Sequence, residues 1–577
     1  MAGGRKRRKK RSKVSKKKPL LSICMIVRDE EENLPGCLED FGPVADQIVV
    51  VDTGSTDRTV DVARRYGAEV HHHPWQDDFA EARNRSLNYA RGRMILWVDA
   101  DDRLEPGVAE TLRRELLANE GKAVYLVVRM LEPGGAVTQS YQLRAFPNNP
   151  TIRFEGRVHE QATYAVERLK ISAVHLPIEI IHTGYQDAEA LRGKLFRNRK
   201  IVEEQIAQDP DDLFAHYMLA RTLDGLGEDE ASAQWCARLL DHPKARMETR
   251  EFILHAQALL ATYHCRRGAV DEGRRLLEEL VARAPEFALG RLLLGKLAVK
   301  SGSLVEACHA LLPILEDEPK PSLIPVDPGE IIYKANRYLG AALMGLGQWG
   351  EASGCLERAL ELRPDDQEAR LWLGESLLKG GRLDEAEKAF LACDGTNHPT
   401  FWLKLGTIAL RRDDLDLAEE RFKAAAAVGL DSAQLYNNFG LLMARQGRWE
   451  EAERNYGLAL ERQPDMMESL LNMGHGLMSQ GRWREVEGFF LRALAHEPEL
   501  LDARLAAAAF AFGRGELARA RELADQLWRA LAPNEQKDQP PPSDPSSLFL
   551  RLGRWLQDRG RGQLAELCDN LVSSITN

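Results

Sequence analysis

The sequence has no C-x-x-C pair and no long apolar run. Its eight cysteines are scattered from Cys24 to Cys568, which is typical of buried thiols in a reducing compartment. No stretch approaches the roughly eighteen apolar residues of a membrane span, so we expect no integral membrane protein and a cytoplasmic location. The apolar residues 20–27 are followed at once by the charged residues 28–32, without a small-residue cleavage site, so we do not expect a signal peptide.

Positive charge is concentrated at one end of the chain. The first twenty residues contain eleven Lys or Arg, from Arg5 to Lys18, and no acid, while the whole chain has a formal net charge of −10. The remainder is therefore near −21. A block of like charge stays solvated, so we expect a disordered tail over residues 1–19 that can touch anionic lipid headgroups. The acidic body shows no basic face, which argues against specific nucleic-acid binding.

Small residues recur at a fixed period between residues 331 and 500. One series steps by 34, 32, 34 and 34 residues: Gly340, Gly374, Gly406, Gly440 and Gly474. A second series moves in phase with it: Ala352, Ala386, Ala418, Ala452 and Val486. Such a period places close helix contacts at fixed points of each unit, and prolines close several units: Pro364, Pro464 and Pro498. This is the tetratricopeptide pattern, and residues 435–465 are one unit.

Weaker units extend the repeats over residues 200–535. Gly227, Gly268 and Gly302 fall in predicted helix-helix turns, and we expect about nine helix pairs that stack into an all-α superhelix with a concave face. That face can bind a peptide or protein, or the array can serve as a spacer or a dimerisation surface. Residues 536–546 are Pro-rich and polar and indicate a linker, which leads to C-terminal helices over 547–577.

The segment before the repeats predicts a different fold. Apolar runs at 21–27, 47–51 and 94–98 alternate with helical stretches at about 58–66 and 78–91, which indicates a parallel sheet with crossover helices. Such sheets bind ligands where strands end. Three of these ends carry acids: Arg28 to Glu30, Asp52 to Asp57, and Asp99 to Asp102. A D-x-D at a strand end suits a hard divalent ion that also takes diphosphate oxygens.

These motifs resemble those of the family-2 inverting glycosyltransferases, and more closely the bacterial branch fused to tetratricopeptide repeats. The matching stretches are ICMIVRDEEENL, QIVVVDTGSTDRT, WQDDFAEARNRSLNYARGRMILWVDADD, FEGRVHEQ and IIHTGY, within residues 20–185. The resemblance implies a Rossmann-like α/β fold of the A-type over residues 20–190 and a UDP-linked sugar donor. The family often has Asn where this chain has Asp29, and Glu where it has Asp102.

The resemblance also implies roles for residues of this sequence. Asp52 corresponds to the uridine-binding acid, and Arg83 to the arginine near the pyrophosphate or base. Asp99 would touch the ribose or the metal, and Asp101 would coordinate manganese or magnesium. His182 resembles the late histidine that closes over the metal, or it is a core histidine. The same strand ends add further residues to the predicted nucleotide-sugar site: Arg28, Glu30 and Ser55.

An inverting transfer needs a base that takes the acceptor proton. Glu160, in the R-V-H-E of residues 157–160, is the candidate base, and the alternative is a surface carboxylate at a turn. His159 would orient Glu160 or line the acceptor site. The tract from His71 to His73 does not predict a metal site, because consecutive strand residues point to opposite faces. Two tryptophans are expected in the core: Trp75 and Trp97.

The sequence therefore predicts a metal-dependent glycosyltransferase that moves a sugar from a nucleotide-sugar donor to an acceptor, possibly a peptide or protein recruited by the repeats. The alternative is a repeat scaffold whose transferase-like domain binds a partner without turnover. The enzyme is favoured by four acids that stand intact with Arg83: Asp52, Asp99, Asp101 and Asp102. A polysaccharide synthase fits poorly without membrane helices.

Overall fold

A computed structural model of the chain describes residues 19–131, 137–184, 188–246, 250–317, 322–393, 399–480 and 482–496, with isolated positions elsewhere. The predicted tail, the linker over 536–546 and nearly all of the residues beyond 500 lie outside this description. The chain divides into two compact units, Met1–Asp365 and Asp366–Asn577. Among the described helices, none is both long enough and apolar enough to cross a bilayer.

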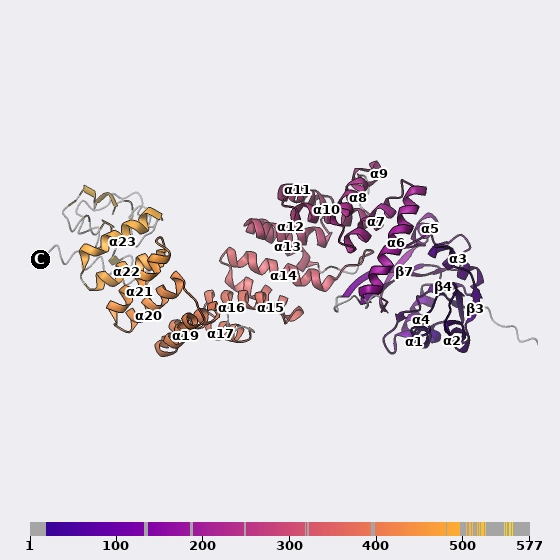
Figure 1. The fold of residues 1–577 in the computed structure, drawn as a ribbon, viewed down its shortest axis with the longest axis horizontal. Helices are drawn as coiled ribbons and strands as arrows, with labels where there is room; N and C mark the ends of the chain where they lie inside the picture. The colour runs from indigo at the N-terminus through magenta and orange to yellow at the C-terminus, as the bar shows by residue number, and fades with distance from the viewer. Residues whose placement is uncertain are drawn as a thin grey trace, which may run out of the picture. The chain divides into compact units, whose positions relative to one another are not determined.

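The first unit begins with an α/β domain on an eight-stranded sheet (Figure 1). The strands are β1 Leu21–Val27, β2 Gln47–Asp52, β3 Glu69–His72, β4 Met94–Trp97, β5 Asp102–Arg103, β6 Ala123–Leu131, β7 Val137–Pro147 and β8 Ala173–His182. Their order is β3-β2-β1-β4-β7-β6-β8-β5. The strands β1 to β4 are parallel, as predicted. The sheet becomes mixed at β7, which is antiparallel to both β4 and β6.

Helices connect the strands and cover the sheet. They are α1 Leu34–Phe41, α2 Thr59–Arg65, α3 Phe79–Tyr89, α4 Val108–Ala118 and α5 Thr163–Arg168, with a short 3₁₀ turn η1 at Gly42–Val44. The bounds of α2 and α3 confirm the helices predicted at 58–66 and 78–91. Successive β1 residues face opposite sides: Ile23 and Met25 belong to one apolar cluster and Cys24 to another. Both faces of the central strand β1 are therefore buried.

The remaining described helices form α6 Ala188–Gln208 and then antiparallel pairs. In the first unit the pairs are α7 Leu213–Gly225 with α8 Asp229–Asp241, α10 Glu251–Arg266 with α11 Val270–Arg283, α12 Ala288–Ser301 with α13 Leu304–Glu316, and α14 Pro328–Gly345 with α15 Trp349–Leu362; α9 is a single turn at Pro243–Arg246. In the second unit they are α16 Gln367–Lys379 with α17 Leu383–Leu391, α18 Pro399–Arg411 with α19 Leu415–Ala427, α20 Ala433–Arg445 with α21 Trp449–Arg462, and α22 Met467–Ser479 with α23 Trp483–His496.

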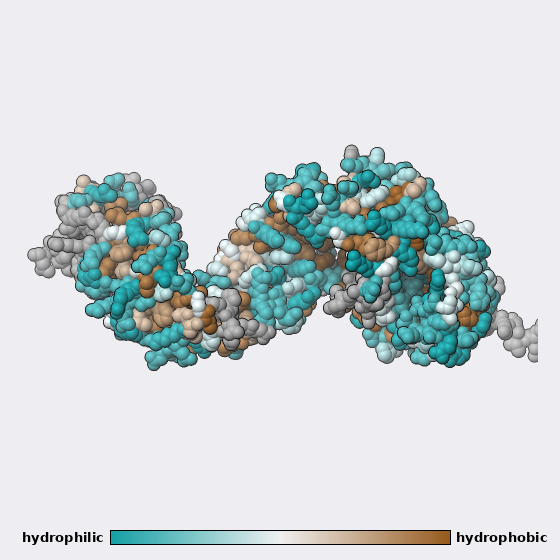
Figure 2. Space-filling view, in the orientation of Figure 1, coloured by the Kyte–Doolittle hydropathy of each residue, from teal (hydrophilic) through white to brown (hydrophobic). Residues whose placement is uncertain are grey.

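The periodic glycines lie where the two helices of a pair touch. A side chain at Gly340 would overlap Leu356, and one at Gly440 would overlap Tyr456. The other three members of the series behave in the same way: Gly374, Gly406 and Gly474. The predicted turn glycines Gly227, Gly268 and Gly302 all have positive φ, between 78° and 84°. On the face that Figure 2 shows, hydrophobic patches interrupt the surface of the repeats, whereas the surface of the α/β domain is mostly hydrophilic.

A segment between two repeat helices pairs with the part of β7 that β4 does not cover. Residues 322–326, which precede α14 and which we call the bridging segment, lie along β7. The backbone N–H of Gln139 donates to Val326 O at 2.7 Å, and Val326 returns a bond of 3.0 Å. Tyr141 N–H donates to Ser322 O at 2.7 Å. The α/β domain and the first helix pairs are therefore joined by hydrogen bonds as well as by the chain.

Candidate active site

The carboxyl ends of the parallel strands bring the predicted site residues to one edge of the sheet. Asp52 is the last residue of β2, and Asp99 and Asp101 follow β4. His182 ends β8 and pairs in register with Asp102 of the short strand β5. Antiparallel pairing in the second half of the domain thus delivers a histidine to the D-x-D motif.

Four side chains form a cluster with the composition of a metal site. Ligand atoms of Asp99, Asp101, Asp102 and His182 all lie within 4.8 Å of one another. His182 Nδ1 is 3.0 Å from an oxygen of Asp102 and 3.3 Å from one of Asp101. A side chain at Gly184 would overlap the Asp101 carboxylate, so a larger residue there would displace that carboxylate. Carboxylates and an imidazole are suitable ligands for manganese, and carboxylates suit magnesium.

Asp102 differs from its neighbours because its oxygens are already bound. The carboxylate is fully buried and accepts a hydrogen bond from the Asp99 backbone N–H at 2.8 Å. It also accepts one from Arg144 Nη1 at 2.7 Å. Asp102 therefore organises the cluster, while Asp99, Asp101 and His182 remain as the metal-binding candidates.

The charges of the cluster shift its pKa values in different directions. Burial alone would raise the pKa of Asp99, but the positive charges of Arg83, Arg144 and His182 hold it well below its usual range. Burial and the neighbouring carboxylates together raise the pKa of Asp101 to about 6, although the charge of His182 partly offsets them. Burial would lower the pKa of His182, but Asp102 and Asp101 raise it overall. A divalent cation would relieve this crowding of negative charge.

Arg83 joins the D-x-D motif to the predicted base. Its Nη2 is 2.7 Å from Asp99 Oδ1, and its Nε contacts Glu160 Oε1. The guanidinium carbon lies 4.2 Å from the centre of the Trp97 ring. Only 10% of the Glu160 side chain is exposed, which does not fit the alternative of a surface carboxylate.

The loop over residues 154–160 is fixed from two sides. The backbone N–H and C=O of Phe154 both bond to the Asn84 side chain on α3, at 2.9 and 3.0 Å. On the other side, Val158 packs into an apolar cluster with residues of α6 and α7: Ile201, Val202, Ile206, Ala215, Leu219 and Leu223. The helix that follows the sheet and the first repeat helix therefore help to position Glu160.

His159 occupies the bend between Val158 and Glu160, with φ of 56°. Its side chain reaches solvent but is crowded by the surrounding helices. This desolvation, together with the positive charges of Arg221 and Arg197, lowers the pKa of His159 to about 4. A lowered pKa favours the neutral imidazole, which can accept a hydrogen bond.

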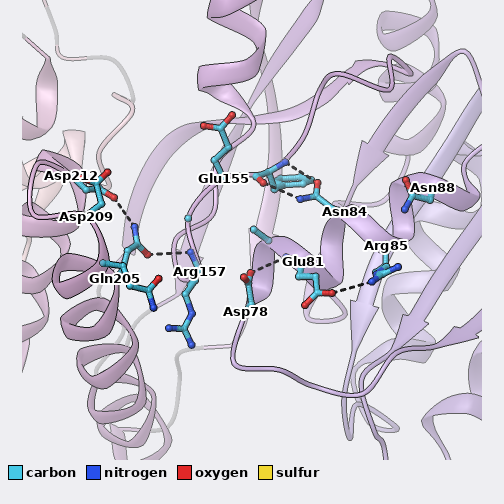
Figure 3. Close-up of a pocket in the computed structure, with 14 residues that line it drawn as sticks. Asp78, Glu81, Asn84, Arg85, Asn88, Glu155, Arg157, Gln205, Asp209 and Asp212 are labelled. Carbon is cyan, nitrogen blue, oxygen red and sulfur yellow. Dashed lines mark hydrogen bonds and ion pairs between the residues drawn. The ribbon is translucent and has the colours of Figure 1, made fainter.

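A polar cleft of about 560 Å³ flanks the same loop on its outer side. Figure 3 shows Asn84 and Arg85 of α3 facing it from one wall and Gln205 of α6 from the other. Gln205 accepts a hydrogen bond from the Arg157 backbone N–H at 3.2 Å. The cleft lies on the face of α3 opposite the buried Arg83, so it is distinct from the acid cluster.

The predicted donor-side residues also meet. Asp52 accepts a hydrogen bond from Ser55 N–H at 3.1 Å, and His72 Nδ1 lies 3.1 Å from its other oxygen. Burial would raise the pKa of Asp52, but these contacts lower it overall. Glu30 is partly buried, which raises its pKa, and the negative charge of Asp99 also raises it. Arg28 is exposed beside Asp29, at 3.8 Å.

The histidine tract has three different environments, as the strand geometry predicted. His71 stacks on Tyr89 with ring centres 3.5 Å apart, His72 contacts Asp52, and His73 lies 3.4 Å from Glu81. Trp97 is in the core, as expected. The expectation for Trp75 is wrong. This side chain is half-buried, and its Nε1 donates to Asp77 at 2.8 Å.

Arg144 is the site residue that sequence reasoning missed. It lies on β7, with only 2% of its side chain exposed, next to Asp102 and 3.7 Å from Asp99. Its guanidinium carbon is 4.0 Å from the Trp97 ring centre. The signal that was available is a lone arginine in the otherwise apolar end of a strand, LRAF, because a buried charge requires a partner.

Comparison with known proteins agrees with this architecture. Residues 22–172 match the family described as glycosyl transferase family 2. Residues 259–314, 339–397, 403–466 and 469–504 match tetratricopeptide repeats. The chain therefore carries a family-2 glycosyltransferase domain followed by tetratricopeptide repeats.

Two curated relatives match part of the chain. A TPR repeat-containing protein of Synechococcus elongatus is 35% identical over 273 residues, which cover 45% of this chain and 66% of that protein. The SPbeta prophage-derived glycosyltransferase SunS of Bacillus subtilis is 26% identical over 248 residues, covering 42% and 58%. This chain thus spans just under two thirds of the first relative and a smaller share of the second. A solved TPR protein of Thermus thermophilus is 28% identical and covers 31% of this chain and 98% of its own, with a TM-score of 0.28.

Proposed function

We propose that the protein transfers a sugar, with inversion, from a UDP-linked donor to a peptide or protein acceptor recruited by the repeats. The donor and metal residues belong to a transferase domain over 20–190, and the acceptor is held by repeats over 200–535. The observation that carries this proposal is the continuous chain of contacts from Glu160 through Arg83 and Asp99 to the acid cluster.

The donor nucleotide would lie at the ends of β1 and β2. Asp52 is held by Ser55 and His72 with its pKa lowered, so it presents a carboxylate that can accept hydrogen bonds from a uracil ring. Arg28 is exposed at the mouth of this region and offers a positive charge to the diphosphate. Glu30 lies between this region and Asp99.

The acid cluster fits a divalent ion. Asp99, Asp101 and His182 would hold manganese or magnesium, and Asp102 with Arg144 would fix their positions. The ion supplies Lewis-acid stabilisation of the leaving diphosphate. The raised pKa of Asp101, caused by burial among other carboxylates, supports this assignment, because a site built for a cation is repulsive without one.

Glu160 would remove the proton from the acceptor nucleophile as the new glycosidic bond forms. Arg83 orients Glu160 through its Nε and Asp99 through its Nη2, so one guanidinium sets the spacing between the base and the metal-binding carboxylates. His159, next to Glu160 in the chain, would orient Glu160 or line the acceptor side. Positioning of this kind supplies much of the rate in two-substrate reactions.

A donor-hydrolysis screen tests the proposal. Purified full-length protein is incubated with a panel of nucleotide sugars, with and without manganese, and free nucleotide is measured. We expect hydrolysis of a UDP-sugar that requires the metal and is lost in Asp101→Asn. Absence of turnover with every donor, while the folded protein still binds a partner through the repeats, would support the alternative of a scaffold with a non-catalytic domain.

A further inference from the structure

One face of α6 runs along the rim of the proposed active site. Lys194 Nζ donates to Gly184 O at 2.8 Å, beside Asp101. Arg197 lies 5.3 Å from the ring centre of Phe79, Ile201 packs on Val158, and Gln205 binds Arg157. These four α6 residues follow the i, i+3, i+7, i+11 spacing of a single helix face. The helix that leads into the repeats is therefore part of the wall of the acceptor region.

The first helices of successive pairs continue this wall. In the first unit α7 contacts α10, α10 contacts α12, and α12 contacts α14. Arg221 is the ninth residue of α7 and Lys296 the ninth residue of α12, so they hold equivalent positions in their pairs. Both Arg197 and Arg221 lie close enough to His159 for their positive charges to lower its pKa.

Further cations gather around Lys296. Burial lowers the pKa of Lys296, and so do the positive charges of Lys300, Lys334 and Arg266, which places these groups near one another. With Arg197 and Arg221 they form a set that we call the basic track: Arg197, Arg221, Arg266, Lys296, Lys300 and Lys334. It extends from the loop that carries Glu160 along the first helices of the repeats.

Most of this charge is not neutralised within the part of the chain that the structure describes. There, Arg197, Arg221, Lys296 and Lys300 have no carboxylate oxygen within 4.0 Å. Only two members of the track are paired: Arg266 with Asp229 at 3.6 Å and Lys334 with Glu330 at 2.9 Å. A row of like charges without counter-charges is unfavourable in the free protein and attracts an anionic ligand.

We propose that the basic track binds an acidic peptide segment of the acceptor and leads it to Glu160. This inference rests on the proposed function and specifies its acceptor. Stacked helix pairs present grooves that suit an extended chain. Neighbouring helices pack roughly 8–10 Å apart, and an extended peptide advances about 3.3 Å per residue. An acidic side chain at about every third residue would therefore match the track.

Other anionic and tethered ligands fit less well. Each strand of a DNA duplex carries a phosphate for about every 3.4 Å of helix axis, which is much denser than one or two cations per helix pair. Asp224 also lies near Arg221 and Arg266, whose positive charges act to lower its pKa. Its carboxylate would repel a continuous polyanion. The chain's own residues 5–18 are basic and are repelled by the track. An acidic peptide is the ligand that satisfies charge and spacing together.

Binding of defined peptides to the full-length protein tests the proposal. The ligand is a fluorescent twelve-residue peptide with glutamate at every third position and serine at the others, and anisotropy gives its Kd. Lys296→Glu with Lys300→Glu should weaken binding at least tenfold, and Lys296→Gln with Lys300→Gln should weaken it by less. Binding should also weaken as salt is raised. The matched control is Lys244→Glu with Arg275→Glu, two exposed cations outside the track.

Three outcomes would overturn the proposal that the basic track binds an acidic peptide. They are unchanged peptide affinity in the Lys296 and Lys300 variants, equal affinity for the same peptide with glutamine in place of glutamate, and tighter binding of a single-stranded oligonucleotide than of the peptide. Donor hydrolysis, measured in the same samples, should be unchanged in every variant. If the wild type hydrolyses no donor, the proposed function fails. The dependence of peptide binding on Lys296 and Lys300 still decides whether the basic track binds an acidic peptide.

Discussion

Arg144 Nη1 and Asp102 Oδ2 lie 2.7 Å apart in a pair of which almost nothing is exposed. Arg144 belongs to β7, and the same strand is bonded at Gln139 and Tyr141 to the bridging segment of the repeats. Asp102 in turn binds the Asp99 backbone and His182. The repeats, the sheet and the acid cluster are therefore connected through one strand.

Removing Arg144 should destabilise the first unit strongly. Arg144→Met leaves Asp102 buried without its partner, and we expect a loss of roughly 3–5 kcal/mol in the free energy of unfolding. Urea unfolding followed by tryptophan fluorescence measures it, since Arg144 lies on Trp97. Arg129→Met is the control, because its pair with Glu179 is partly exposed and should cost less than about 1 kcal/mol. Similar losses in the two variants would contradict this assignment.

Glu160→Gln should abolish transfer while leaving the donor site intact. Loss of a general base typically lowers the rate by about 10²–10⁴-fold, and the amide keeps the size of the side chain. Transfer to acceptor and binding of UDP are measured separately. Glu155→Gln, on the same loop but paired on the surface with Arg168, should retain activity. Near-normal transfer by the Glu160→Gln enzyme would show that another residue is the general base.

Chelation and Asp101→Asn should have the same effect. If Asp99, Asp101 and His182 hold the ion, a chelator should remove donor hydrolysis and added manganese should restore it. In Asp101→Asn manganese should restore little, since a neutral amide is a weaker ligand than a carboxylate. Calorimetric titration with manganese measures the loss directly. Hydrolysis that survives chelation would exclude the metal.

His255 should make the first repeat pairs sensitive to acid. Burial and the charge of Arg221 lower the pKa of His255 from 6.5 to about 3. Between these values the unfolded chain binds a proton that the folded chain does not, so the free energy of unfolding falls as pH falls from 6.5, by up to about 1.4 kcal/mol per pH unit. Above pH 6.5 this contribution is complete.

Hydrogen exchange in α7 and α10 at pH 7 and pH 5 measures this effect. The loss of protection on acidification should be roughly 1–2 kcal/mol smaller in His255→Gln, which keeps a group able to bond Tyr217. The same substitution at His264, near the end of α10, is the matched control. An identical pH dependence in His255→Gln and the wild type would show that this imidazole titrates normally.

Truncation should separate the two compact units. A chain ending at residue 365 keeps α6, the helices packed on Val158 and the bridging segment, so it should retain donor hydrolysis. A chain ending at residue 200 contains every residue predicted for the donor site, but it exposes Val158 and the free edge of β7. We expect it to aggregate or unfold, as measured by circular dichroism. A folded, active fragment ending at residue 200 would show that the repeats do not support the catalytic domain.

Local patterns determined much of this protein. The alternation of apolar runs and helical stretches is set by near neighbours, so β1, β2, β4, α2 and α3 were predictable. The period of the glycines was also sufficient to predict the repeats, because a helix pair makes the same close contact in each unit. The acids at strand ends were found for the same reason, since parallel neighbouring strands end at one edge of the sheet.

Only the tertiary structure decided which distant groups meet. Arg144 looked like one arginine in a strand until antiparallel pairing with β4 and β6 buried it beside Asp102. The sequence showed no basic face on the acidic body, because the cations of the basic track are spread from Arg197 to Lys334 and separated by many acids along the chain. Contacts of this kind depend on strand order and helix stacking, which bring together residues too far apart along the chain for a local pattern to relate them.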